Sequence, residues 1–331
     1  MNWLKLDNDR IAVWVFDFDG NVLPTNEVTV WYFRDRKTWK IIETTEVGCW
    51  KYLQDKERYW HIEEWDFSST LISFREPADR YSHPDVASLC KWHNSFRDDV
   101  EKALELDKVS PSLYDFKDIF LVPGRIWTIL TARWNSQDKI EKDWLKIINN
   151  SILTEEEWKE QAENIRKNFN LKERNDIKVI DWYFREIFFY LPINNPHVAK
   201  MWNLPVTGNN SWEMKWLAMN RYINESVTFQ LERLYNKPIL DILSKESRWL
   251  SIWFSDDWRT NIVEVFKANV SKLNEEGSLA EKYHKYIHYF TWDRNQYEEL
   301  KEQLTQIAWK TIKLEFVEHD DKLEITFYNN K

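Results

Sequence analysis

Glycine and cysteine are both scarce in this chain. Its 331 residues contain 5 glycines, whereas glycine usually makes up about 7% of a protein. The two cysteines, Cys49 and Cys90, show no Cys-x-x-Cys spacing and no paired spacing. These counts argue against a disulfide framework and against structural zinc, so we expect a reducing compartment.

Long apolar runs and an excess of basic residues are absent too. No run approaches the roughly 18 residues that cross a bilayer, and the N-terminal sequence MNWLKLDNDR lacks a charged segment followed by an apolar one. We therefore expect a soluble, cytoplasmic protein without a membrane partner. The 46 Lys and Arg residues are outnumbered by 55 Asp and Glu residues, and the formal net charge of −9 disfavours extended binding to nucleic acid.

Tryptophan, in contrast, is abundant. The 21 tryptophans and 5 glycines together make 26 residues, about 8% of the chain, which is close to the usual share of glycine alone. Many tryptophans stand in turn or cap sequences, such as KTWKI, TARWNS and FSDDWRTN, where a positive φ or a close backbone approach favours glycine. We infer that most of them are UGA codons that the source organism reads as glycine. The alternative is a protein truly rich in tryptophan, which would carry these residues on apolar faces at helical or strand spacing.

Strand-like and helix-like segments alternate along most of the chain. Five short apolar segments predict buried strands, with their turns, in residues 10–22, 125–133, 176–184, 249–257 and 285–291. Helical periodicity appears in residues 137–151, 154–169, 211–235, 259–276 and 295–308. The alternation predicts an α/β fold with a Rossmann-like, three-layer parallel sheet that binds ligands at the carboxyl ends of its strands. Residues 311–328 alternate with a period of two around HDD and predict a hairpin.

Residues 26–111 interrupt this alternation and predict an inserted cap. They begin with strand-like segments in 27–35 and 37–47, pass through the aromatic and acidic sequence RYWHIEEWDF, and end in an amphipathic helix, 93–107. The remainder of the chain then forms the core. That core comprises residues 1–25 and 112–331, of which 135–210 leaves room for a further elaboration.

Acidic residues follow two of the predicted strands. Asp17 and Asp19 in VFDFDG are separated by one residue, so in an extended segment their side chains point the same way. Two carboxylates held together repel each other unless a cation compensates, which favours Mg²⁺. For this motif alone, an ordinary Asp-Gly turn after a buried strand is the alternative. Asp256 and Asp257 end the fourth predicted strand and complete the acidic set.

Two further positions suit an anionic ligand. Thr131 ends the second predicted strand, where its hydroxyl and the following N–H groups, beginning at Ala132, could hold an anion. Lys215 lies in the first turn of a predicted helix capped by Asn210 or Ser211. A lysine there opposes the helix dipole, and an anion bound at the helix N-terminus would explain it. Taken singly, a structural threonine and a solvated lysine are the alternatives.

The four motifs together resemble those of the haloacid dehalogenase superfamily, in its phosphatase branch. DFDG, ILT, the lysine of EMKWLA, and FSDD match in order and in spacing. Glycine at positions 216 and 258 would bring the match closer. The resemblance implies a haloacid dehalogenase-like core with an inserted cap. Asn21 departs from the pattern, because threonine is common at this place after DG, and the departure bears on fine positioning.

The resemblance also implies roles for the residues of the motifs. Asp17 would attack phosphorus to give an aspartyl-phosphate, and Asp19 would protonate the leaving oxygen and later activate water. The transferring phosphoryl group would be held by Thr131, Ala132 and Lys215. Mg²⁺ would be bound by Asp17, the carbonyl of Asp19, Asp256 and Asp257, the last as a ligand or through a ligand.

We therefore expect a Mg²⁺-dependent phosphatase that hydrolyses a small phosphorylated metabolite beneath a closing cap. Two alternatives stay open. One is a nucleic-acid end phosphatase of the same fold, which would need a basic track beside the site. The other is a non-catalytic binding protein that retains the fold. The sequence discloses neither the substrate nor the oligomeric state.

Other polar and aromatic residues are weaker candidates. His284 and His288 have i, i+4 spacing, but no third ligand is apparent, so a structural role is expected. Five residues could touch a substrate, although surface or structural duty is the simpler interpretation: Arg75, Arg80, His93, Lys178 and Arg185. An aromatic group in the insertion is expected to form cap core or a surface that faces the substrate: Tyr59, Trp60, Trp65 and Phe67.

Overall fold

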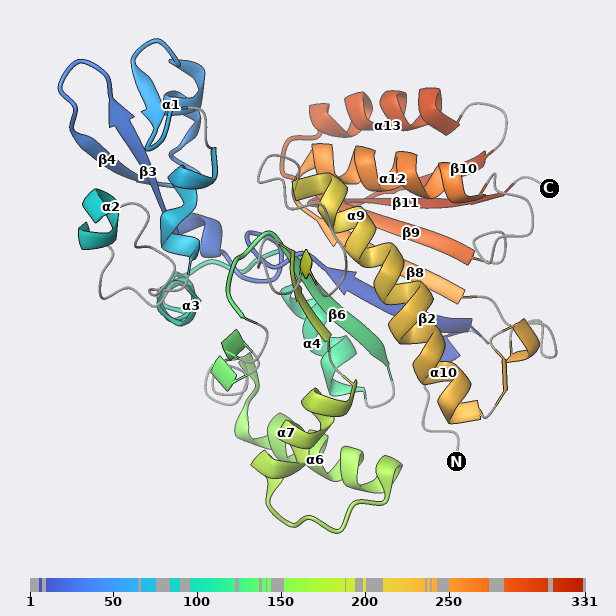
Figure 1. Cartoon of the computed structure of the whole chain (residues 1–331). Coiled ribbons are helices and arrows are strands. Elements are labelled where there is room, and N and C mark those ends of the chain that lie inside the picture. Colours follow the sequence, from blue (N-terminus) through green and yellow to red (C-terminus); the bar gives the residue numbers. More distant parts are fainter. Residues whose placement is uncertain are drawn as a thin grey trace.

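The computed structural model places eight strands in one mixed sheet (Figure 1). Their bounds are β1 (Leu6–Asp7), β2 (Arg10–Phe16), β6 (Ile126–Thr131), β7 (Phe189–Pro192), β8 (Leu250–Asp256), β9 (Tyr283–Phe290), β10 (Ile312–Glu318) and β11 (Lys322–Asn329). The structure describes residues 6–7, 10–64, 67–75, 84–89, 96–122, 125–136, 139–140, 142–143, 152–187, 189–193, 199–200, 211–235, 237–238, 240–242, 250–273, 283–308 and 312–329.

The central part of this sheet is parallel. The order is β10-β11-β9-β8-β2-β6-β7, and β1 pairs antiparallel with the first two residues of β2. The pairs from β9 to β7 are parallel, whereas β10, β11 and β9 pair antiparallel. Four of the five predicted strands and the C-terminal hairpin are confirmed. The side chains of β6 and β8 are buried in nearly continuous runs, as expected for strands covered on both faces.

The segment 176–184, predicted as a strand, is a helix. It lies within α7 (Asp176–Ile187), which begins where Asn175 Oδ1 accepts the Lys178 N–H at 3.0 Å. The buried residues Val179, Ile180 and Tyr183 recur at helical spacing and lie on one face. A short apolar run does not by itself distinguish a buried strand from a buried helix face. The strand that pairs with β6 is instead β7.

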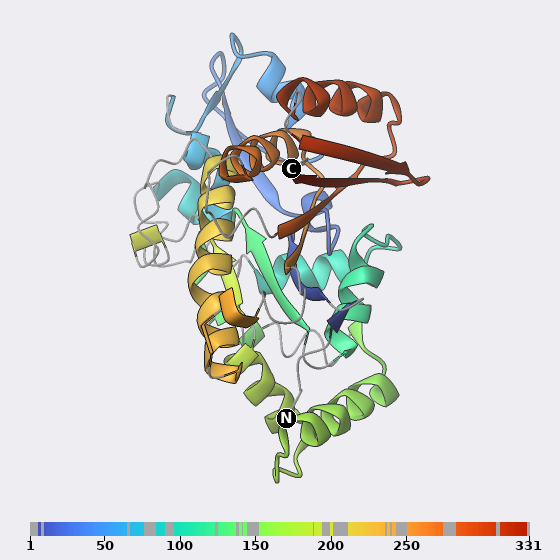
Figure 2. The same ribbon diagram turned by 90° about the vertical axis from the view of Figure 1, so that its right-hand side faces the viewer.

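Helices cover the sheet on its two faces (Figures 1 and 2). One face carries α9 (Ser211–Arg221), the π-helical η5 (Tyr222–Val227), α10 (Thr228–Tyr235), α12 (Arg259–Leu273) and α13 (Asn295–Ala308). The other carries α4 (Leu113–Leu121), α6 (Glu155–Phe169) and α7. Successive residues of a strand point to opposite faces and so contribute to two separate hydrophobic cores. In β6, Ile126 and Leu130 pack in the core on the first face, and Trp127 and Ile129 pack in the core on the second.

The predicted helices are largely confirmed. A capping box at Thr154 and Glu157 starts α6, and the segments 211–235, 259–276 and 295–308 contain α9, η5, α10, α12 and α13. Most of the segment 137–151 lies outside the described residues. Within the described residues, no helix combines the length and the apolar composition of a membrane span.

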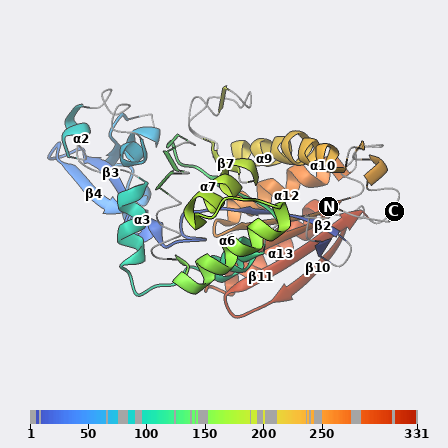
Figure 3. The ribbon, with the colours of Figure 1, turned by 90° about the horizontal axis from the view of Figure 1, so that it is seen from below.

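The segment between β2 and α4 builds a second, smaller unit (Figures 1 and 3). It contains η1 (Thr25–Glu27), β3 (Val30–Asp35), β4 (Ile41–Thr45), α1 (Trp50–Gln54), β5 (Tyr59–His61), η2 (Phe67–Phe74), α2 (Pro84–Leu89) and α3 (Arg97–Leu104). The antiparallel sheet has the order β4-β3-β5 and two small cores of its own. In both views this unit lies beyond one end of the main sheet, on the side where β2 ends.

Tryptophans occupy two kinds of position in this fold. Trp127 is fully buried and packs edge-on against Phe116 and Phe120, as a true core tryptophan does. Trp39, in the β3–β4 turn, is 65% exposed and has a φ of 58°, a conformation that favours glycine. The position of Trp39 agrees with the codon interpretation, and that of Trp127 with the alternative.

Candidate functional site

The ends of β2 and β8 bring two acidic residues together. Asp17 follows β2, and Asp256 is the last residue of the neighbouring β8. The Asp17 N–H donates to the Ser255 carbonyl at 2.9 Å, which continues the strand pairing to the position of the carboxylates. Both side chains are buried. Residues that are 239 positions apart in sequence thus meet because their strands are adjacent and parallel.

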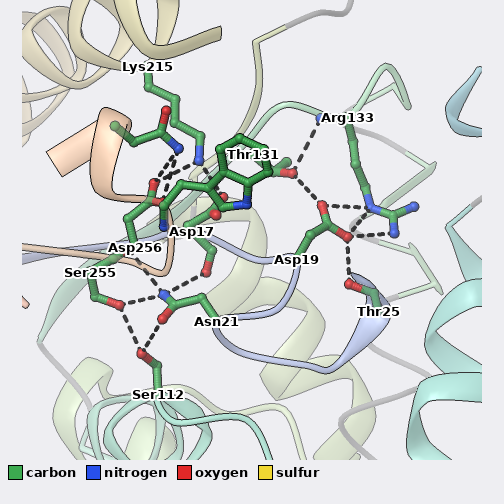
Figure 4. Close-up of polar contacts among 12 residues, drawn as sticks. Asp17, Asp19, Asn21, Thr25, Ser112, Thr131, Arg133, Lys215, Ser255 and Asp256 are labelled. Atoms are coloured by element: carbon green, nitrogen blue, oxygen red, sulfur yellow. Dashed lines mark hydrogen bonds and ion pairs between the residues drawn. The ribbon is translucent and has the colours of Figure 1, made fainter. Parts of the chain in front are cut away.

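Asn21 bonds the loop that follows β2 to β8. Its Nδ2 donates to the carbonyl oxygens of Asp17 at 3.2 Å and Ser255 at 3.1 Å, and its Oδ1 accepts the Ser112 hydroxyl at 2.8 Å (Figure 4). An amide can bridge all three groups because it both donates and accepts. The departure from the family pattern at position 21 is therefore a buried structural link beneath Asp17.

Lys215 of α9 joins the two carboxylates. Its Nζ lies 2.8 Å from Asp17 Oδ1 and 2.8 Å from Asp256 Oδ2, and the side chain is buried (Figure 4). Lys215 is the fifth residue of α9 as described, which places it near the N-terminal end of the helix. Its charge is balanced by carboxylates of the protein itself. An anion at the helix N-terminus is not needed to explain it.

Asp257 adds a third carboxylate and an unsatisfied oxygen. Oxygens of Asp17, Asp256 and Asp257 lie within 4.8 Å of one another, and no other metal-ligand group of three or more His, Cys, Asp or Glu residues occurs in the described parts of the chain. Asp257 Oδ1 is buried with no hydrogen-bond partner there. A Cβ at Gly20, whose φ is +75°, would lie 2.4 Å from Asp257 Oδ2, so the carboxylate packs where only glycine leaves space.

These four residues, Asp17, Lys215, Asp256 and Asp257, are called the Asp17 cluster below. Burial raises the pKa of Asp17 well above its usual value, against the lowering effect of Lys215. Burial, Asp17 and Asp256 likewise raise the pKa of Asp257. Burial by itself would lower the pKa of Lys215, but the two carboxylates raise it. Three carboxylates, two of them buried and one half-buried, against one ammonium and with an oxygen unbonded form a donor set that suits a hard cation such as Mg²⁺.

Asp256 is held from several directions. Its Oδ1 accepts the backbone N–H of Trp258 at 2.8 Å, and both of its oxygens accept Asn261 Nδ2 at 3.0 Å. The backbone of residue 258 therefore takes part in the site, whereas its indole stacks on Trp50 of the insertion, with ring centroids 5.8 Å apart. Glycine at position 258 would keep the backbone bond and remove the stack.

The Asp19 carboxylate turns away from that of Asp17 (Figure 4). The expectation that the two side chains point the same way is wrong, because β2 ends at Phe16 and residues 17–19 do not continue as an extended strand. Asp19 accepts hydrogen bonds from Thr25 Oγ1 at 2.6 Å, Thr131 Oγ1 at 3.0 Å and the guanidinium of Arg133. Its side chain is not among the group with metal-ligand spacing.

Thr131 and Ala132 lie where the sequence predicts, at the end of β6. The Thr131 hydroxyl is buried against Asp19, and Ala132 is half-buried beside it. Arg133 was not predicted. It follows Thr131 by two residues in TAR and is completely buried. The anionic partners of a buried arginine come from elsewhere in the fold, so the local sequence does not show them. The position of Arg133 just after a strand end is the one signal that the sequence offers for it.

Glu46, which was also not predicted, reaches the site from the insertion. It follows β4, and the Val47 N–H donates to the Asn26 carbonyl at 3.4 Å. Burial and the nearby Asp19 raise the pKa of Glu46 to about 7. A cavity of about 550 Å³ opens beside it, lined in part by Glu46, Trp50, Asp257, Trp258 and Glu299. Both the insertion and the core thus contribute walls to one cavity.

The remaining candidates lie elsewhere or have structural contacts. Arg75 stacks over the indole of Trp134 at 4.3 Å, and Lys178 is exposed on α7. His284 stacks on Tyr328, and His288 is buried against Trp253. Tyr59 packs on Tyr52, and Trp60 lies beneath Arg36. Outside the described residues, or with side chains that are not described, are Arg80, His93, Arg185, Trp65 and Phe67.

Comparison with known proteins finds no matching family model, no matching curated protein and no matching solved structure. The geometry of the site is therefore the basis for any statement about function.

Proposed function

We propose that this chain is a Mg²⁺-dependent phosphatase of the haloacid dehalogenase type, which hydrolyses a small phosphorylated metabolite through an aspartyl-phosphate at Asp17. The supporting observation is the Asp17 cluster, in which two buried carboxylates contact one ammonium and the half-buried Asp257 beside them keeps an unbonded oxygen. A nucleophilic carboxylate beside a fixed cation is the arrangement that phosphoryl transfer requires.

The residues of the chain would divide the reaction between them. An oxygen of Asp17 attacks phosphorus in line with the leaving oxygen, and the bond from phosphorus to that oxygen breaks. Asp19 gives the leaving oxygen a proton, and in the second half of the reaction it takes a proton from the water that attacks the aspartyl-phosphate. Lys215, held against Asp17, stabilises charge on the transferring oxygens, and the Thr131 hydroxyl orients Asp19.

Mg²⁺ would be held by Asp17, Asp256 and Asp257, with the carbonyl of Asp19 as a further oxygen donor. When bound, it supplies positive charge that neutralises the phosphoryl group and reduces its repulsion from the carboxylates. The unbonded Asp257 oxygen and the all-oxygen donor set fit this ion.

The cavity beside Glu46 supports a small substrate. Its volume of about 550 Å³ falls within the range of pockets for small molecules, roughly 300–1,000 Å³. The carboxylates of Glu46, Asp257 and Glu299 line it, while Arg259 is paired with Glu299. Such a lining repels a polyanion, which disfavours the nucleic-acid alternative. The insertion, which supplies Glu46 and Trp50, would act as the cap.

The test is turnover of p-nitrophenyl phosphate with Mg²⁺ by the wild type, by Asp17→Asn and by a control, Asp118→Asn, whose carboxylate is exposed on α4. The Asp17 variant should lose more than about a thousandfold in kcat, since the covalent route is lost. The wild type and the control should be equally active, and acid-quenched wild type should carry one phosphoryl group. Equal activity of the Asp17 variant and the wild type, or inactivity of all three, would refute the proposal and favour a binding protein.

A further inference from the structure

Arg133 is a fully buried guanidinium shared between two carboxylates. Its Nε lies 3.0 Å from Asp19 Oδ1 and 3.2 Å from Oδ2, and its Nη2 lies 2.7 Å from Asp19 Oδ1. Its Nη1 donates to Asp99 Oδ2 at 3.0 Å, and Nη2 also contacts Thr29 Oγ1 at 3.2 Å. Arg133 and Asp99 are both completely buried. These residues, Arg133, Asp19, Asp99 and Thr29, are called the Arg133 cluster.

The partners of Arg133 come from both units of the fold. Asp19 belongs to the loop after β2, whereas Asp99 lies on α3 of the insertion and Thr29 lies between η1 and β3. Thr29 Oγ1 donates to Asp99 Oδ2 at 3.0 Å, so the two insertion residues are also bonded to each other. The guanidinium therefore links the insertion to the Asp19 loop, because it forms ion pairs with Asp99 and with Asp19.

Aromatic rings enclose this junction. The Arg133 Cζ lies 5.8 Å from the Phe18 ring centroid, 5.0 Å from that of Phe74 and 5.6 Å from that of Phe96. Phe74 and Phe96 belong to the insertion, and Phe18 stands between Asp17 and Asp19. A guanidinium removed from water in this way needs its fork of donors matched by acceptors in fixed places. The orientation of Asp19 is thus specified by a rigid, desolvated partner.

We propose that Arg133 is a positioning residue: it fixes the Asp19 carboxylate, and Asp99 and Thr29 of the insertion fix Arg133. Docking of the insertion then sets the geometry of the group that moves the proton. The proposal rests on the phosphatase function proposed above. An acid–base group must lie within hydrogen-bond reach of the proton that it moves, and an error of about 1 Å can cost roughly a hundredfold in rate.

The main test uses Asp99→Asn, which keeps the size of the side chain and weakens its hold on Arg133. In rapid mixing with p-nitrophenyl phosphate, the nitrophenolate leaves without needing a proton, so the first step does not depend on Asp19. Hydrolysis of the aspartyl-phosphate does depend on it. The variant should release its first equivalent of nitrophenolate at nearly the wild-type rate and then turn over about tenfold more slowly.

Matched variants separate positioning from folding. Glu101→Gln, on the same helix in an exposed pair with Arg97, should behave as the wild type. Arg133→Lys keeps the charge but cannot span both carboxylates, so it should also slow the second step selectively. If Asp99→Asn and Arg133→Lys lower the burst and the steady rate by the same factor, or change neither, the positioning role is wrong.

A second measurement uses the leaving group. For kcat/KM, the ratio of p-nitrophenyl phosphate to glycerol phosphate should rise about tenfold in Asp99→Asn, because the alkoxide of glycerol needs the Asp19 proton. An unchanged ratio contradicts the proposal. The two proposals fail differently: inactivity of the wild type on the aryl phosphate removes both, whereas an active wild type with an inert Asp17→Asn and unselective Asp99 and Arg133 variants removes only this one.

Discussion

The two sides of the loop from Asp17 to Asp19 carry buried charge clusters of different kinds. The Asp17 cluster has three carboxylates, one ammonium and a carboxylate oxygen without a hydrogen-bond partner in the described structure. The Arg133 cluster has two carboxylates whose oxygens accept hydrogen bonds from the guanidinium and from neighbouring hydroxyls. Asp17 and Asp19 are only two residues apart in sequence. Asp17 nevertheless belongs to a cluster with an unbonded carboxylate oxygen, whereas the carboxylate of Asp19 is hydrogen-bonded by its neighbours.

The difference follows from the cost of burying charge. A buried carboxylate that lacks a partner is strongly unfavourable, and one bonded by a guanidinium is not. Binding a cation would therefore lower the electrostatic cost of the Asp17 cluster. In the Arg133 cluster, the guanidinium already compensates the carboxylates. We interpret the first as the place where chemistry occurs and the second as the support that holds one of its groups in position.

Removing one carboxylate from each cluster should give the largest contrast. Asp256→Asn should raise the Mg²⁺ concentration for half-maximal activity at least about a hundredfold, because even indirect partners of a metal change its affinity by up to that factor. Asp99→Asn should leave this concentration unchanged. The measurement is a Mg²⁺ titration of p-nitrophenyl phosphate hydrolysis. The same Mg²⁺ dependence in Asp256→Asn and the wild type would remove the distinction between the clusters.

Stability measurements examine the same contrast without any substrate. Mg²⁺ at about a hundred times its Kd should raise the free energy of unfolding of the wild type by about 2.7 kcal/mol. Asp257→Asn should lose most of this gain and should be more stable than the wild type without Mg²⁺, since it removes the repulsion between this carboxylate and those of Asp17 and Asp256. Urea denaturation with and without Mg²⁺ measures both. A wild type that Mg²⁺ does not stabilise is inconsistent with this account.

A second buried lysine extends the comparison to cations. Lys285 of β9 is buried like Lys215, but its Nζ donates to the amide oxygen of Asn269 at 2.5 Å, and burial lowers its pKa to about 7. Between this value and the usual one, near 10.4, the unfolded chain binds a proton that the folded protein does not, so stability rises with pH. The rise from about pH 7 to about pH 9 should be about 2 kcal/mol.

Lys285→Met removes the titrating group and should abolish this rise. It should also raise the stability near neutral pH, where burial of the ammonium is unfavourable. Urea denaturation of the wild type and the variant at both pH values is the measurement. Parallel stability profiles for the two proteins would show that Lys285 keeps its proton in the folded state.

The smallest expected effect lies far from both clusters, in the β3–β4 turn. Trp39→Gly should stabilise the protein by about 1 kcal/mol, because the left-handed backbone at φ 58° is unfavourable for a residue with a Cβ. Trp292→Gly is the matched control, since Trp292 is 75% exposed and is not among the residues of positive φ in the described chain. Thermal unfolding compares them. No gain at position 39 over position 292 would count against glycine as the natural residue.

The sequence predicts the parallel strands because each is a local signal. β2, β6 and β8 are short apolar runs that end in polar residues. Strands of this kind are buried on both faces of a parallel sheet. The same rule fails at 176–184, where it predicts a strand but the apolar residues have helical spacing and form α7. Local patterns identify burial more reliably than they identify the element that is buried.

The sequence by itself determined which acids stand at strand ends and that β2 and β8 are buried parallel strands, since both facts depend on neighbouring residues. The tertiary structure alone decided that Lys215 joins Asp17 to Asp256, that Asp19 turns to Arg133, and that Glu46 and Asp99 come from the insertion to meet them. Such partners are distant in sequence. A buried charge is satisfied by whichever group the packed chain brings within hydrogen-bond distance, and no local pattern records that choice.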